Sequence, residues 1–526
     1  MNPRPPDPQS GALPTELRSP WNLLCHSGRQ TAKRGSLETV GPCSRYELPL
    51  AGAVYPVTGV GQPPNRQRII VLVPYELFHR EDAQMADKIR TEFAKPAGET
   101  DGEHLLGKHL TRRSMLKGSL YGLLGSVFWD GLISEGRAVP VNTPATAKRC
   151  IVLFMNGGPT QTDTFDPKPD HANGGPFRAI KTSADGMLLS DKLPRLAEQG
   201  KHLTLVRSMA TQEGNHSRGR YLMHTGYTPT NSVKHPSFAS ILSAEVGDPS
   251  FELPNAVALN SPAFDAAFLG AEHDPFFVPD PMAGVDNLSY PVGMYLGRFT
   301  ARRDMVSFLN KHFAERTTDE VLDREAIYEK ADQMIHSDLT ASFELEQEPQ
   351  ALREAYGMNN FGQGCLMARR LVEAGVRCVE VSLDGWDTHQ DNFTSVERLL
   401  GVVDPAMATL IADLEARDML HETLVMWLGE FGRTPKINEN DGRDHWPNGW
   451  SVALAGGGLV GGRVVGATDE AGEKIVDGPV SVEDFYYSLC GLFGVDAAKV
   501  NFSRIGRPMK IVNGGAEVPG LLGSAG

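Results

Sequence analysis

The sequence predicts an α/β fold, with a mostly parallel central sheet and helices on both of its faces. Three observations lead to this prediction. Short apolar runs bounded by glycine or polar residues are typical of buried strands. Segments with helical spacing lie between these runs, and several begin with a capping residue and end at glycine. Alternation of the two kinds of segment is typical of parallel βαβ units with right-handed crossovers.

The strands and helices can be placed along the chain from these signals. The expected strands are Ile151–Met155, Leu203–Val206, Val376–Leu383 and Leu424–Leu428. Four helices are expected. The first begins after Ser190 and ends at Gly200, and the second covers Gln363–Ala374 up to Gly375. The third begins with Asp404 and Pro405, and the fourth begins with Ser481 and Asp484 and ends at Gly494. Residues 318–348 are charged and helical in pattern, and we interpret residues 227–300 as a loop-rich insertion that shapes a cleft.

Composition excludes some classes of protein. The chain has 526 residues, which is enough for one large domain with extensions. It carries 51 basic and 65 acidic residues, a net charge of −14, which argues against general binding to nucleic acid. No close CxxC pair is present, which argues against a zinc ribbon or a disulfide scaffold. Cys150, Cys365, Cys378 and Cys490 lie beside apolar residues, so we expect buried free thiols.

The N-terminal region differs from the rest of the chain. Residues 1–105 are expected to be disordered or a mis-annotated extension, with translation starting near Met85. Residues 106–147 contain Arg112-Arg113, a modest apolar stretch and small residues, which resembles a twin-arginine export signal and a linker. This predicts a periplasmic or extracellular protein without a membrane span in the mature chain; the alternative is an ordinary amphipathic helix. The main domain is expected at 148–515, followed by a tail at 516–526.

Polar residues follow four of the apolar runs. The four segments are 156–166, 215–220, 384–392 and 429–447. Because parallel strands end at the same edge of a sheet, these segments are expected to gather there. Carboxylates mixed with imidazoles suit a divalent ion such as Zn, Mn, Mg or Ca. The alternative is a hydrogen-bond network that only stabilises the loops, with Asp163 and Asp166 capping turns.

Three runs of sequence carry a family resemblance. MNGGPTQTDTFDPKP from Met155, DGWDTHQDN from Asp384 and GEFGRTPKINENDGRDHWP from Gly429 resemble the bacterial DUF1501 family, a domain of unknown function. The resemblance covers roughly residues 148–512. The family is grouped with the alkaline phosphatase and sulfatase superfamily, so the resemblance implies an alkaline phosphatase-like three-layer sandwich. No activity is established for the family itself.

The resemblance also implies metal ligands, residue by residue. Asn156 lies where a metal-binding aspartate normally ends the first strand, and Asp163 is a candidate substitute. Asp387 and His389 resemble an Asp and His ligand pair, and His445 resembles a late histidine ligand. Glu430 stands where the superfamily has Asp-His, so one imidazole is missing. We expect the side chains of Asp387, His389, Glu430 and His445 to converge on one ion.

The candidate catalytic residues come from the second and fourth segments. In sulfatases the nucleophile begins a helix motif that reaches Thr-Gly after nine residues. Counted back from Thr225-Gly226, the resemblance therefore implies His216 at the nucleophile position and Arg220 at the position of an assisting arginine. His216 is then a nucleophile, a metal ligand or a general acid. Ser217 becomes the nucleophile if the count shifts by one. Arg218, Arg220 and Arg433 offer forked donors for a phosphate or sulfate oxygen.

These residues favour an exported metal-dependent hydrolase of small phosphate or sulfate esters. Two alternatives remain. One is a non-catalytic extracytoplasmic binding protein on a degenerate version of the same fold. The other is a cofactor-independent mutase or transferase.

Overall fold

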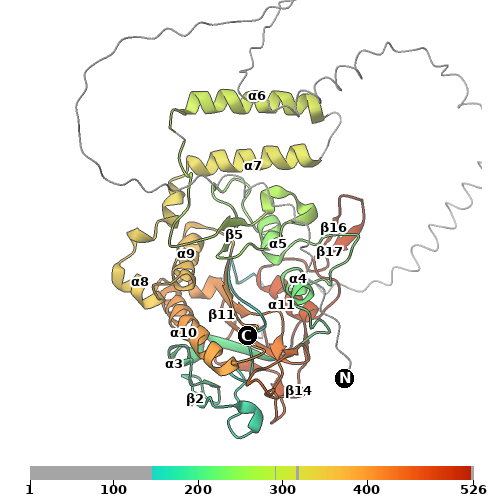
Figure 1. Cartoon of the computed structure of the whole chain (residues 1–526). Coiled ribbons are helices and arrows are strands. Elements are labelled where there is room, and N and C mark those ends of the chain that lie inside the picture. Colours follow the sequence, from blue (N-terminus) through green and yellow to red (C-terminus); the bar gives the residue numbers. More distant parts are fainter. Residues whose placement is uncertain (1–144, 291, 315–318, 523–526) are drawn as a thin grey trace, which may run out of the picture. The chain divides into compact units, whose positions relative to one another are not determined.

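The computed structural model describes residues 145–290, 292–314 and 319–522, which form an α/β fold (Figure 1). The predicted extension at 1–105 and the Arg112-Arg113 signal lie outside these residues. Among the described helices, none combines the length and the hydropathy that crossing a membrane requires.

A nine-stranded sheet forms the centre of the fold. Its strands, in order across the sheet, are β12 (Arg463–Val465), β4 (Leu203–Ala210), β11 (Trp450–Gly456), β8 (Thr423–Leu428), β1 (Arg149–Asn156), β7 (Cys378–Asp384), β5 (Ala256–Leu259) and β6 (Phe276–Val278), with β15 (Val480–Ser481) beside β4. Neighbouring strands are parallel except that β11 runs antiparallel to β4 and β8. The predicted mostly parallel sheet is therefore confirmed.

The central strand β1 contributes side chains to two separate cores. Its six inner residues are all buried and apolar, as a strand covered on both faces requires. Because side chains alternate along a strand, Ile151, Leu153 and Met155 enter one core while Val152 and Phe154 enter the other. Helices must therefore cover both faces of the sheet.

The helices do cover both faces (Figure 1). The first core contains residues of α3 (Pro194–Glu198), α8 (Gln350–Tyr356), α9 (Asn360–Ala374) and α10 (Asn392–Ala416). The second contains residues of α4 (His216–Thr225), α5 (Phe238–Glu245) and α11 (Val482–Leu492). Two further helices are α6 (Leu296–Ala314) and α7 (Asp319–Ile335). Short two-stranded sheets are formed by β2 (Ala179–Lys181) with β3 (Leu188–Ser190), β9 (Gly432–Arg433) with β10 (His445–Trp446), β13 (Ala467–Thr468) with β14 (Ile475–Asp477), and β16 (Val500–Phe502) with β17 (Pro508–Lys510).

Several local predictions are confirmed. The four expected strands are present, α9 ends at Gly375 in the left-handed region (φ 119°), and Ser481 and Asp484 form a capping box at the start of α11. Cys150, Cys365, Cys378 and Cys490 are buried and free.

Two local predictions are wrong. Residues 227–300 are not only a loop insertion, because β5 and β6 extend the central sheet. The second error concerns Asp404, which lies inside α10 together with Pro405 and does not begin the helix. Its carboxylate instead accepts hydrogen bonds from the backbone N–H groups of Arg195 (3.1 Å) and Leu196 (2.8 Å). Asp404 therefore caps the neighbouring helix α3.

The sheet brings three of the polar segments to one edge. Both β7 and β8 pair in parallel with β1, with Asn156 opposite Asp384 and Phe154 opposite Leu428. The loops that follow these strands thus leave the sheet side by side. The helix α10 makes the crossover from β7 to β8, passing over one strand.

Candidate metal centre

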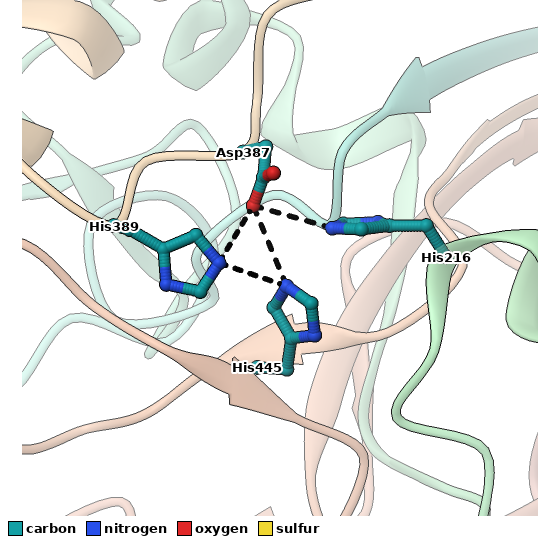
Figure 2. Close-up of side chains that lie close together, drawn as sticks. All are labelled: His216, Asp387, His389 and His445. Atoms are coloured by element: carbon teal, nitrogen blue, oxygen red, sulfur yellow. Dashed lines mark hydrogen bonds and ion pairs between the residues drawn. The ribbon is translucent and has the colours of Figure 1, made fainter. Parts of the chain in front are cut away.

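Four side chains meet at this edge of the sheet: His216, Asp387, His389 and His445 (Figure 2). His216 is the first residue of α4, and the next two lie in the loop after β7. His445 lies on β10, which pairs with β9 just beyond the end of β8. One ligand atom from each residue lies within 4.8 Å of the others. Residues far apart in sequence therefore form one compact polar group.

Asp387 lies at the centre of the group. Its Oδ1 atom is 3.2 Å from Nε2 of His216, 3.0 Å from Nε2 of His389 and 3.4 Å from Nε2 of His445. The Nε2 atoms of His389 and His445 are 3.0 Å apart. In a tetrahedral zinc site with ligands about 2.1 Å from the ion, neighbouring ligand atoms are about 3.4 Å apart. These four distances are close to that spacing, and all of the ligand atoms lie within 4.8 Å of one another.

The other nitrogen of each histidine ring is held by a fixed partner. Nδ1 of His216 lies 2.7 Å from Oε1 of Glu430, and Nδ1 of His389 lies 2.7 Å from Oδ1 of Asp444. Nδ1 of His445 donates to the carbonyl oxygen of Gly214 at 2.7 Å. Such partners are typical of metal-binding histidines, because they fix the ring and leave the lone pair on Nε2.

This donor set fits a cation. With Nδ1–H donating outward, each ring presents a lone pair on Nε2 toward a carboxylate oxygen. Acceptors facing one another at about 3 Å repel unless a cation or proton lies among them. Within the described part of the chain, the buried Nε2 of His216 makes no hydrogen bond and has only the 3.2 Å ion-pair contact with Asp387, which fits a metal ligand. The four residues thus fit a divalent metal.

Arg433 controls the charge and the position of Asp387. Its guanidinium is fully buried and donates to Oδ1 of Asp387 at 2.5 Å, to the carbonyl oxygen of Gly158 at 2.9 Å, and to that of Gly157. Burial raises the pKa of Asp387, but the hydrogen bond and charge of Arg433, followed by the nearby imidazoles, outweigh burial and lower this pKa to about 2. Asp387 is therefore ionised at any ordinary pH.

The two imidazoles nearest the protein interior differ in their basicity. The hydrogen bond that His216 donates to Glu430 is the main cause that raises the pKa of His216, with burial opposing it. Burial is the main cause that lowers the pKa of His445. The neutral form, which is the form that binds metals, is therefore favoured at His445.

Gly157 allows the first and third segments to touch. Its φ is +119°, a conformation that other residues rarely adopt, and a Cβ here would lie 2.4 Å from the backbone nitrogen of Asp387. The Gly157 N–H also donates to Oε1 of Glu430 at 2.9 Å. A larger residue would push the metal-facing loop away from the sheet.

Comparison with known proteins decides the family. The model of the family described as "Protein of unknown function (DUF1501)" matches residues 147–522, which is more than half of the chain. The chain belongs to the DUF1501 family. The resemblance predicted from the three sequence runs is thus confirmed. No curated protein matches the sequence.

Solved structures resemble this DUF1501 member at low identity. They include a sulfatase from Pseudoalteromonas sp., with 13% identity, a TM-score of 0.33, and coverage of 73% of this chain and 72% of that one. The lipoteichoic acid synthase of Listeria monocytogenes has 8% identity and a TM-score of 0.31, with coverage of 72% and 77%. A magnesium-bound variant of TAB5 alkaline phosphatase has 11% identity and a TM-score of 0.26, with coverage of 59% and 92%.

Some of the predicted metal ligands lie in the four-residue group, and others lie outside it. Asp387, His389 and His445 lie in the four-residue group, whereas Glu430 contacts it through His216. Asn156 lies at the end of β1, where its side-chain amide donates to Oδ1 of Asp384 at 2.7 Å. Asp163 is fully buried away from the group and forms an ion pair with Arg443, with Oδ2 at 2.8 Å from Nε. Both oxygens of Asp163 are occupied by this guanidinium.

The predicted catalytic residues are also dispersed. His216 lies within the group as a potential ligand. Ser217 follows it as an exposed residue at the start of α4, and Arg220 lies one turn further along the helix, half-buried. Arg433, which the sequence suggested as a donor to substrate, is fully buried, and its donors go to Asp387 and backbone carbonyl groups. It therefore acts on Asp387 and not on an incoming anion.

The sequence did not reveal the residues that hold the histidine rings. Asp444 fixes His389 across 55 positions of sequence, and the carbonyl of Gly214 fixes His445 across 231. Asp444 carried one usable signal, because it precedes His445 in a polar run. The carbonyl of Gly214 carried none, because every residue has a carbonyl group and its direction depends on the folded loop.

Glu430 is expected to control metal affinity from behind His216. Glu430→Ala removes the acceptor for Nδ1 and frees the ring, so we expect metal affinity to fall by about 10- to 100-fold. Glu430→Gln keeps an oxygen for His216 and Gly157 and should lose less. Competition titration with a chelator measures both affinities. Equal affinity in Glu430→Ala and the unchanged protein would contradict this role.

Proposed function

We propose that this DUF1501 member is an exported metal-dependent hydrolase of small phosphate or sulfate esters. One observation carries the proposal: three Nε2 atoms and one carboxylate oxygen face a common point, and each ring is fixed from behind. Export rests on the Arg112-Arg113 signal in the sequence alone. The ion is a divalent metal, with Zn favoured over Mn, Mg and Ca because three imidazoles suit a borderline ion.

The residues would divide the work as follows. His216, Asp387, His389 and His445 would hold the ion, and Arg433 would keep Asp387 ionised and correctly turned. A divalent ion in such a place polarises an ester oxygen and lowers the pKa of water. The side chains of Asp387 and His389 are 49% and 44% exposed, so one side of the group faces solvent. Four protein ligands fill a tetrahedral ion, so water or an ester oxygen would enter from this exposed side as a fifth ligand.

A second candidate is a non-catalytic extracytoplasmic binding protein on the same fold. One feature favours it: the position that the resemblance gives to the nucleophile holds His216, whose ring belongs to the four-residue group. Water would be the nucleophile of the proposed hydrolase, because His216 belongs to the metal group and Ser217 is exposed at the start of α4.

Metal analysis and substrate screening separate the two candidates. The purified protein would be tested for bound metal, then assayed with aryl phosphates and aryl sulfates in Zn, Mn, Mg and Ca. A hydrolase binds metal and turns over one ester class, and loses both in His445→Ala but not in His421→Ala, an exposed histidine elsewhere. Metal binding without turnover of either class would support the binding protein. Absence of metal binding would refute the metal-dependent hydrolase.

A further inference from the structure

Helix α6 lies on α7, and α7 is attached to the rest of the fold (Figure 1). Lys330 on α7 donates to the carbonyl oxygen of Phe251 at 2.6 Å, and Asp323 pairs with Arg504 at 2.5 Å. The described contacts of α6 are mainly with α7, through Arg303 to Asp332. One side of α6 is therefore left facing outward.

The side of α6 that meets α7 is polar. Arg303, Ser307 and Asn310 recur at helical spacing and share one face. Arg303 pairs with Asp332, and both Ser307 and Asn310 lie 3.4 Å from Oε1 of Glu325. This face is satisfied by hydrogen bonds and an ion pair instead of apolar packing.

The outward side of α6 is apolar and cationic. Met305, Phe308 and Leu309 share a face roughly opposite to Arg303, and they are 65%, 61% and 49% exposed. Arg298 and Arg302 are both exposed and lie on the same side, because Arg298 precedes Met305 and Arg302 precedes Leu309 by seven residues, which is about two turns. A soluble surface helix normally turns its apolar face inward. Here that order is reversed.

We propose that the outward face of α6 docks on an anionic lipid surface. Apolar side chains of an interfacial helix enter the boundary between headgroups and acyl chains, while arginines at its margin pair with phosphates. Three arginines and a single carboxylate, Asp304, lie on residues 296–310, although the whole chain has a net charge of −14. Arg303 faces α7, so Arg298 and Arg302 supply the positive charge beside the exposed apolar side chains.

The same charges disfavour a second copy as the occupant. Pairing two α6 helices face to face in parallel would bring Arg298 and Arg302 close to their own copies, and like charges in contact destabilise an interface. The carboxylates of α7 that could offset them, Glu325 and Asp332, already contact α6 within the chain. An anionic bilayer offers phosphate groups to both arginines without this conflict.

Vesicle binding tests the proposal with the full chain. The protein would be sedimented with vesicles of phosphatidylglycerol and phosphatidylcholine, and with phosphatidylcholine alone. The joint change Met305→Gln, Phe308→Gln and Leu309→Gln should weaken binding to the anionic vesicles at least tenfold. Arg298→Gln with Arg302→Gln should weaken it and remove the preference for anionic lipid. These side chains are exposed, so circular dichroism should show unchanged helix content.

A matched control lies on the β16–β17 pair and the turn between its strands. Val500, Phe502 and Ile505 are 43%, 67% and 73% exposed, and changing all three to Gln removes as many exposed apolar side chains. This variant should bind within twofold of the unchanged protein. No binding by the unchanged protein, or an equal loss in the control, would overturn the proposal. A dimer in light scattering that the α6 variant dissociates would assign the face to a second copy.

Discussion

Replacing His389 by alanine is expected to abolish metal binding while leaving the fold intact. Nε2 of His389 lies 3.0 Å from both Oδ1 of Asp387 and Nε2 of His445, so it is central to the donor set. The loss of metal affinity in His389→Ala should exceed the loss of about 10- to 100-fold that follows from changing a residue that holds a ligand from behind. The side chain is 44% exposed, so little core packing is lost.

Metal content by mass spectrometry and a thermal shift with added Zn or Mn measure this effect. An ion that binds only the folded state raises the melting temperature. Added metal should therefore raise the melting temperature of the unchanged protein and not that of His389→Ala. His421→Ala is the matched control, because His421 is exposed and contacts only Asp418 among the described ion pairs. Equal metal content in His389→Ala and the control would refute the proposed site.

Breaking the ion pair of Arg443 with Asp163 is expected to cause the largest loss of stability. Both side chains are fully buried, and Asp163 also accepts from Asn392 at 2.8 Å and from Thr160 at 2.9 Å. Arg443→Met would leave a buried carboxylate without its counter-charge. Removing one partner of a buried pair costs about 3–5 kcal/mol of the free energy of unfolding.

Denaturant unfolding measures this loss against a surface pair. Lys192 pairs with Glu397, whose side chain is 59% exposed, and Lys192→Met should cost only about 0–1 kcal/mol. The double change Asp163→Leu with Arg443→Met removes both charges and should recover part of the stability. Similar losses for Arg443→Met and Lys192→Met would show that the buried pair contributes little.

The sequence predicts the sheet well because buried strands have a strong local pattern. Leu424–Leu428 is uniformly apolar, and β8 is buried along its whole length. The same pattern fails for β5, whose four residues lie in a region rich in proline and aromatic residues. Asp404 was misplaced because a side chain can cap a helix other than its own, and only the folded packing of α3 against α10 shows this.

The candidate site is predicted in part for a similar reason. The places of Asp387, His389 and His445 follow from strand ends, which the apolar pattern reveals. The role of Arg433 does not follow, because a buried arginine and a substrate-binding arginine look alike in sequence. His216 approaches the group only because α4 begins there, with Asn215 as its N-cap. That geometry depends on contacts across the sheet.

The antiparallel strand β11 gives the segment between β8 and β11 a particular place in the order of folding. Because β8 and β11 are neighbours, residues 429–449 form a loop whose base closes as soon as these two strands pair. Loop closure costs less chain entropy for short loops than for long ones, so His445 and Arg433 should be positioned early. His216 joins Glu430 across 214 positions, so the complete donor set should form only in the last stages of folding. A metal would then stabilise the finished fold and none of its precursors.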